Sequence, residues 1–221
     1  MSFTSSINLS SLNGTNGFRL DGEQGYNFAG VSVASAGDVN GDGYADVIVG
    51  ATGAGNAGAA YVVFGQPGAY AGSIGLGTLD GTTGFKLAGG QNGNNIGYSV
   101  ASAGDVNGDG FADLIIGAPN PNGNPSASYV VFGKSSQFAP TINLANLDGS
   151  TGFRINGSAG RDRSGYSVAS AGDVNGDGFA DLIIGAPNTA ANNKAGTGYV
   201  VFGKPSGFAS SIDLARIIHQ V

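Results

Sequence analysis

The 221-residue sequence predicts an all-β fold made of repeated units, and three observations support this prediction. A twenty-residue motif, SVASAGDVNGDGYADVIVGA at 32–51, returns almost unchanged at 99–118 and 167–186. Short runs of β-branched and aromatic residues bounded by glycine accompany each copy, as is typical of buried strands. No segment longer than about ten residues shows the spacing of an amphipathic helix. We therefore expect one small sheet per repeat.

Each repeat is expected to contribute four strands, which the second copy illustrates. Residues Tyr98–Ala103 alternate between apolar or aromatic and small polar side chains, the pattern of a half-buried strand. Leu114–Ile116 and Tyr129–Phe132 are short apolar runs that suit strands buried on both faces, and Phe153–Ile155 is a shorter fourth strand. The tail at 212–221 is ambiguous. Four short antiparallel strands per repeat predict the blade of a β-propeller.

The predicted organisation is a single repeat domain over residues 1–221 with three blades. The first blade covers 22–90, the second covers 91–158, and the third covers 159–221 without a fourth strand of its own. Residues 1–21 carry a fourth-strand pattern that has no blade. Because propellers usually have four to eight blades, three do not close a ring. We expect two chains to exchange these N-terminal strands, giving a six-bladed homodimer; the competing interpretation is a piece of a longer propeller.

Composition excludes several classes of function. The formal net charge of −6 and the isoelectric point near 4.4 argue against nucleic-acid binding, which needs a basic face. The chain has no cysteine, which removes disulfides and thiolate sites, and its one histidine is His219. No apolar run approaches the ~18 residues of a membrane span. The N-terminus shows no signal peptide, so the chain stays inside the cell, leaves by another route or has lost its signal.

One acidic loop per repeat, between the first and second strands, carries the strongest chemical signal. It has oxygen-bearing side chains at positions 1, 3, 5 and 9, a glycine at position 6, and a position-7 residue whose carbonyl is available. That pattern suits a hard cation, and calcium better than magnesium, because calcium accepts a cage of six to eight protein oxygens. The side-chain candidates are Asp38, Asn40, Asp42 and Asp46; Asp105, Asn107, Asp109 and Asp113; and Asp173, Asn175, Asp177 and Asp181.

The alternative interpretation of these loops is that Asp, Asn and Gly simply form good turns. Three copies in matching register argue against it. Three divalent cations would also bring the formal charge from −6 to about zero. The loop is not an EF-hand, because position 12 is not glutamate and strands flank it.

The motif resembles the FG-GAP repeat of integrin α-subunit propellers and their bacterial relatives. The resemblance rests on Gly-Tyr-Ser-Val at 97–100, D-x-N-x-D-G-x-x-D at 105–113 and Ile-Gly-Ala-Pro at 116–119, and it extends over three copies. It implies a propeller with one calcium ion per blade, three per chain, held by the twelve side chains above. It also implies that the carbonyls of Tyr44, Phe111 and Phe179 are ligands. The first copy departs from the pattern, with Thr52 where the others have proline.

The resemblance and the loops together favour a calcium-binding scaffold for binding or assembly, adhesion-like and extracellular or at the cell surface. The alternative is a lectin-like propeller that binds carbohydrate. Expected partners are a second copy of the chain and a protein or glycan ligand. Tyr61, Tyr129 and Tyr199 either stack on sugars or, as we favour, pack between blades. We expect no enzyme activity, because the clustered carboxylates are assigned to cations.

Overall fold

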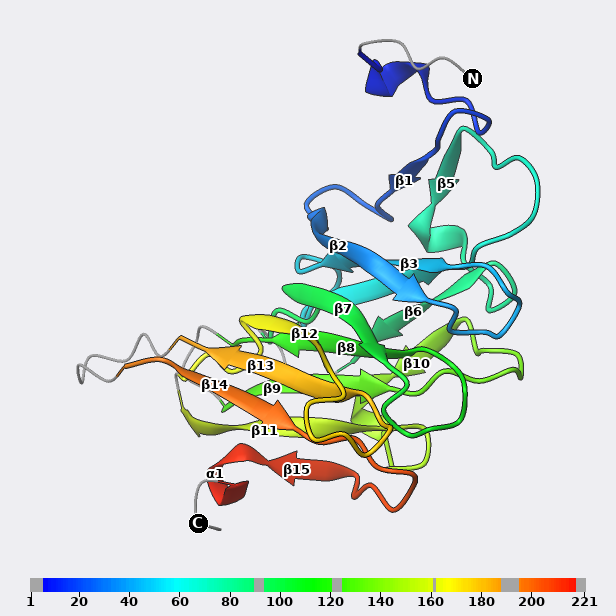
Figure 1. The fold of residues 1–221 in the computed structure, drawn as a ribbon. Helices are drawn as coiled ribbons and strands as arrows, with labels where there is room; N and C mark the ends of the chain where they lie inside the picture. Colours follow the sequence, from blue (N-terminus) through cyan, green and yellow to red (C-terminus); the bar gives the residue numbers. More distant parts are fainter. Residues whose placement is uncertain (1–5, 90–93, 121–124, 161, 188–194, 218–221) are drawn as a thin grey trace.

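The fold of the chain is almost entirely β-sheet in a computed structural model, which describes residues 6–89, 94–120, 125–160, 162–187 and 195–217. Figure 1 shows a two-stranded ribbon of β1 and β5 at the top, the sheet that contains β2 and β3 below it, and two further sheets that overlap in the lower part of the view. We call these sheets 1, 2 and 3 in chain order. The described segments nearest the two termini lie far apart (Figure 1).

Sheets 1 and 2 have the same topology. Sheet 1 has the order β10 (Thr141–Asn143), β6 (Gly84–Ala88), β4 (Ala59–Val63), β3 (Asp46–Ala51) and β2 (Ala29–Gly37). Sheet 2 has the order β15 (Ser211–Asp213), β11 (Gly152–Gly160), β9 (Pro125–Val131), β8 (Asp113–Ala118) and β7 (Ser99–Gly104). The expected strands are therefore confirmed, although β9 and β11 extend further than their apolar runs.

Sheet 3 and the ribbon are smaller. Sheet 3 contains β12 (Ser167–Gly172), β13 (Asp181–Ala186) and β14 (Thr197–Val201), all antiparallel. The ribbon pairs β1 (Arg19–Asp21) with β5 (Ser73–Gly75) in parallel. In the described part of the chain, β14 therefore has a neighbour on one side only.

Sheets 1 and 2 are one strand wider than the four strands expected. In each, a three-residue segment from the next repeat adds in parallel to the outer strand, with Ile142 opposite Leu87 in sheet 1 and Ile212 opposite Ile155 in sheet 2. These isoleucines pack against the cores, and the added strand covers an edge that would otherwise be open. Four short helices occupy equivalent places in the repeat: η1 (Leu9–Ser11), and η2 (Leu76–Thr78), η3 (Leu144–Asn146) and α1 (Leu214–Ile217), which directly follow β5, β10 and β15.

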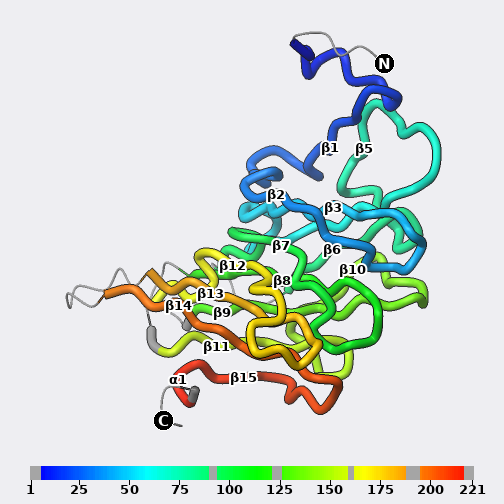
Figure 2. Tube along the Cα trace, in the orientation of Figure 1, coloured from blue at the N-terminus to red at the C-terminus, as the bar shows by residue number. Residues whose placement is uncertain are grey.

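The hydrophobic cores lie between successive sheets. Alternation along a strand places neighbouring side chains on opposite faces, so Ile48 of β3 faces sheet 2 and Val49 faces the ribbon. Tyr61 and Tyr129 are 0% and 2% exposed, which confirms their role in packing. The inner strands β2, β7 and β12 lie next to one another (Figure 2). This stack of repeated sheets fits a β-propeller, and the sheets formed by the described residues do not close into a ring.

Candidate metal centre

The three acidic loops occupy equivalent places, each joining the innermost strand of a sheet to the next strand. In sheet 2 the loop runs from Asp105 to Ala112, between β7 and β8. Gly108 and Gly110 have φ angles of +74° and +91°, a left-handed conformation that favours glycine. Two such residues let the chain turn tightly enough for the polar side chains to face their own backbone.

Hydrogen bonds within the loop hold its side chains in place. The Asp105 carboxylate accepts from the amides of Gly108, Asp109 and Gly110 at 2.6, 3.0 and 2.9 Å. The Asn107 side chain accepts from the Asp109 amide at 3.0 Å and donates to the Asp109 carboxylate at 2.8 Å. The same bonds recur in the loops of sheets 1 and 3. The loop conformation is therefore a property of the local sequence.

The aspartate at position 9 has a second role that the sequence analysis missed. Asp113 is fully buried, and its carboxylate accepts from the amides of Val106 and Gly133 at 2.8 and 2.9 Å. It thus ties the start of the loop to the residue just beyond β9, and Asp46 and Asp181 make the equivalent pairs of bonds. The repeated Phe-Gly after the third strand, as in Phe132-Gly133, was the available sequence signal.

Burial perturbs the ionisation of Asp46 and Asp113. The pKa of Asp46 is raised to about 6 and that of Asp113 to about 7, mainly by burial and to a smaller extent by the other carboxylates of the same loop. The two backbone amides act in the opposite direction without cancelling the effect. The ion pairs among the described residues join Arg19 to Asp21, Lys86 to Glu23 and Arg216 to Asp213, so none reaches a loop. Each loop therefore buries an acidic side chain that has no basic partner among the described residues.

The donor set suits a hard cation in chemistry, since every candidate ligand atom is an oxygen. Within the described ranges, no three acidic or histidine side chains gather closely enough to hold an ion, and oxygens of Asp105 and Asp109 accept hydrogen bonds within the loop. Which of the predicted residues bind metal therefore stays a prediction. His219 lies outside the described residues.

The following sheet supports each of the first two loops, a feature that sequence reasoning also missed. The amides of Ala112 and Lys134 in sheet 2 donate to the carbonyls of Asp38 and Val39 at 3.0 and 2.9 Å. Ala180 and Lys204 do the same for the loop of sheet 2. The ring of Phe111 lies so close to Gly41 that a Cβ there would overlap it. The sequence analysis predicted Phe111 only as a carbonyl donor, yet its ring braces the preceding loop.

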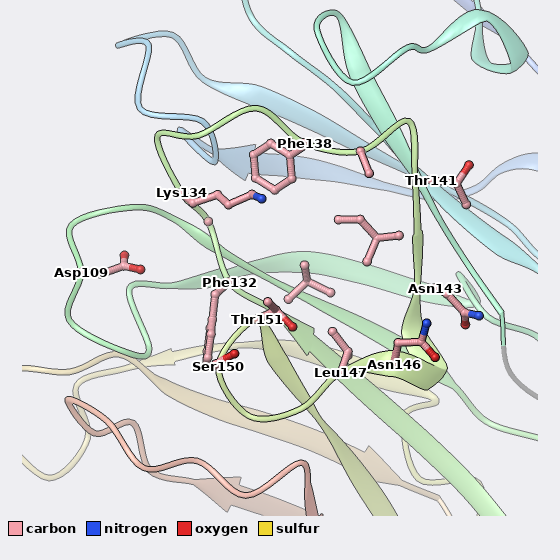
Figure 3. A pocket seen from close by; sticks show the side chains of 14 residues that line it. Asp109, Phe132, Lys134, Phe138, Thr141, Asn143, Asn146, Leu147, Ser150 and Thr151 are labelled. Carbon is pink, nitrogen blue, oxygen red and sulfur yellow. The ribbon is translucent and has the colours of Figure 1, made fainter.

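A cavity of about 380 Å³ lies between the outer parts of sheets 1 and 2. Figure 3 shows Phe132 and Phe138 on its wall, with Asn143 and Asn146 on the far side. The Lys134 ammonium lies 4.9 Å from the centre of the Phe138 ring. The walls combine apolar surface with a few amide groups, as small-molecule sites do.

Comparison with known proteins agrees with the threefold pattern. The model of a family described as "FG-GAP repeat" matches residues 29–63, 96–131 and 164–201, which span the first three strands and the acidic loop of each sheet. The chain is an FG-GAP repeat protein. Its three repeats place it among integrin-α-like proteins.

Three relatives illustrate the similarity of this FG-GAP protein to known chains. Integrin alpha-PS2 of Drosophila melanogaster is 35% identical over 129 residues, which are 56% of this chain and 9% of the relative. Integrin alpha pat-2 of Caenorhabditis elegans is 32% identical over 186 residues, 80% of this chain and 14% of the relative. A phosphatidylinositol-glycan-specific phospholipase D of Dictyostelium discoideum is 31% identical over 198 residues, 80% of this chain and 20% of the relative. The FG-GAP chain thus spans a small part of each.

In the part of the FG-GAP chain that the structure describes, no helix has the length and apolar character needed to cross a membrane.

Proposed function

We propose that the chain is a calcium-binding β-propeller module that serves as a scaffold for binding or assembly. The observation that carries this proposal is the repeated acidic loop, which buries a carboxylate without a basic partner. A bound divalent cation would supply the missing positive charge. The FG-GAP repeats and the integrin α relatives support the same function.

Each chain would hold three calcium ions, one per loop. In sheet 2 the ligands would be the side chains of Asp105, Asn107, Asp109 and Asp113 with the carbonyl of Phe111, and sheets 1 and 3 would use the equivalent residues. Calcium would cross-link the loop to the base of the second strand, so its role is structural. We propose an extracellular or cell-surface location, where calcium is abundant enough to fill weak sites.

Each sheet would be one blade, with bounds 22–90, 91–158 and 159–221, and two chains would close a six-bladed ring. Residues 1–21 would complete the third blade of the second copy. We propose no catalytic role: although one relative is named a phospholipase D, the carboxylates that an acid–base pair would need are engaged in the loops. The proposed ligand of the closed ring is a protein.

Thermal unfolding in calcium and in chelator tests this function. A ligand that binds only the folded chain adds about 2.7 kcal/mol at one hundred times its dissociation constant. Three sites therefore predict a midpoint many degrees higher in calcium than in chelator, with magnesium at equal concentration giving a smaller shift. Equal midpoints in calcium and chelator would refute the proposal.

A carbohydrate-binding function is the alternative, and the cavity between sheets 1 and 2 favours it. Its amide groups from Asn143 and Asn146 and its aromatic wall suit a sugar. Glycan-array binding that Asn146→Ala abolishes and Asp177→Ala, in a loop away from the cavity, leaves intact would support the lectin function. Absence of binding to any glycan in calcium would remove it.

A further inference from the structure

The outer face of sheet 3 exposes side chains that the other two sheets bury. Four apolar positions of the repeat are 0–8% exposed in sheets 1 and 2, where the following sheet covers them. The same four positions in sheet 3 are Val174, Ile183, Val200 and Phe202, with exposed fractions of 60%, 42%, 39% and 54%. Such a contiguous apolar face marks a surface that binds another protein.

The opposite end of the stack exposes the complementary side. Val33 on β2 is 67% exposed, whereas the equivalent Val100 and Val168 are 6% and 7% exposed because the preceding sheet covers them. Tyr44, equivalent to the bracing residue Phe111, is 43% exposed. Within the described residues, sheet 1 thus presents a surface like those that cover another sheet, and sheet 3 presents a face that no other sheet covers.

The aromatic residues of the repeat form three-ring clusters that are complete at two places and divided at the third. Phe64, Phe85 and Phe138 form one cluster, in which the last two rings stack at 4.4 Å. Phe132, Phe153 and Phe208 form the second, with stacking at 4.6 Å.

The third cluster is split between the two ends of the chain. Phe18 and Tyr70 stack at 4.3 Å beside the ribbon, whereas Phe202, directly after β14, is 54% exposed and pairs with no other described aromatic ring. Bringing the two parts together would also place β1 along β14, as β6 lies along β4.

The third acidic loop lacks the support that the other two receive. A Cβ built on Gly41 or Gly108 would overlap a phenylalanine ring of the next sheet, whereas one on Gly176 would have no described atom within 4 Å. No sheet follows sheet 3 in the described part of the chain to donate to the carbonyls of Asp173 and Val174. Among the described residues, this loop therefore lacks the bracing contacts that the other two loops receive.

We propose that sheet 1 of a second copy docks on sheet 3 and completes the third loop. Tyr44 of the second copy would cover Gly176, and the amides of its Ala45 and Gln66 would donate to the carbonyls of Asp173 and Val174. This inference rests on the proposed calcium function and adds that the third site forms between two chains. Calcium binding at that site and dimerisation therefore strengthen each other.

Light scattering in calcium tests the interface. The wild-type chain is expected at twice 21.7 kDa. Val174→Arg on the sheet 3 face and Val33→Arg on the sheet 1 face should each give a folded monomer, since both residues are exposed in the single chain. Gln137→Arg, on an exposed loop outside both faces, is the matched control and should stay dimeric.

Mixing the two monomeric variants sharpens the test. A heterodimer of Val33→Arg with Val174→Arg places both arginines at one contact and leaves the other contact unmodified. The mixture should therefore form dimers that neither variant forms alone. A monomeric wild type, dimers that survive both substitutions, or a mixture that stays monomeric would each overturn the proposed docking.

Calcium titration separates this inference from the proposed function. The wild type should bind three ions per chain, and the Val33→Arg monomer, whose third loop is unaltered, should bind two with unchanged affinity and the third at least tenfold more weakly. Three equal sites in that monomer would overturn the link between the third loop and the second copy. Absence of calcium binding in every variant would refute the calcium function, whereas a calcium-loaded monomeric wild type would refute only the docking.

Discussion

Alanine substitution of the position-4 glycine in each loop should have unequal effects, although the three loops have the same internal geometry. Gly41, Gly108 and Gly176 have φ angles of +74°, +74° and +77°. Alanine in this left-handed region costs about 1–2 kcal/mol, and the lower entropy of its unfolded chain returns about 0.4–1 kcal/mol. All three variants therefore share a loss of roughly 1 kcal/mol.

The environments of the three glycines then separate the variants. At Gly41 and Gly108 the new methyl group overlaps the rings of Phe111 and Phe179, and forcing an atom into a packed contact costs about 1–3 kcal/mol more. At Gly176 the methyl group meets open space in the single chain. We expect Gly41→Ala and Gly108→Ala to lose about 2–4 kcal/mol, and Gly176→Ala to lose about 1 kcal/mol.

Urea unfolding in calcium, followed by far-UV circular dichroism, measures these differences at protein concentrations that keep the chain monomeric. At higher concentration Gly176→Ala should also weaken the dimer, because Tyr44 of the second copy would meet the added methyl group. Equal losses at low concentration for all three variants would refute the reasoning that the following sheet braces each loop.

Two further predictions concern aspartates, three in the acidic loops and one in a turn. Asp42→Ala, Asp109→Ala and Asp177→Ala should each remove about one calcium ion by isothermal titration, since the loops share no ligand; loss of all three ions in one variant would contradict this. The Ser150 and Thr151 donors lower the pKa of Asp148 to about 2, so its ionised form stabilises the fold above about pH 4 and that contribution fades as the pH falls toward 2. Asp148→Asn should keep the turn, as Asn13 does in the equivalent position, yet lose this acid dependence in unfolding experiments from pH 7 to pH 2; an unchanged pH profile would contradict it.

Period and local pattern were enough to predict the all-β fold, the sheet per repeat and the position of each acidic loop. They did not predict the fifth strand, because Thr141–Asn143 and Ser211–Asp213 are three-residue segments whose pairing depends on an edge left by the previous repeat. They also missed the second role of Asp113, since its partner Gly133 lies twenty residues away and is found only once β8 and β9 are paired.

The sharpest limit of local sequence lies in two segments with the same twenty letters, residues 99–118 and 167–186. Their loops form the same hydrogen bonds, because those bonds join residues five positions apart or fewer. Yet Ile115 is 0% exposed and Ile183 is 42% exposed. Burial at these positions is decided by the sheet that follows, so the same letters produce a braced loop in one place and an unbraced loop in the other. A repeat protein can therefore carry chemically identical sites whose strengths differ, and the unbraced site is the one whose properties depend on a partner.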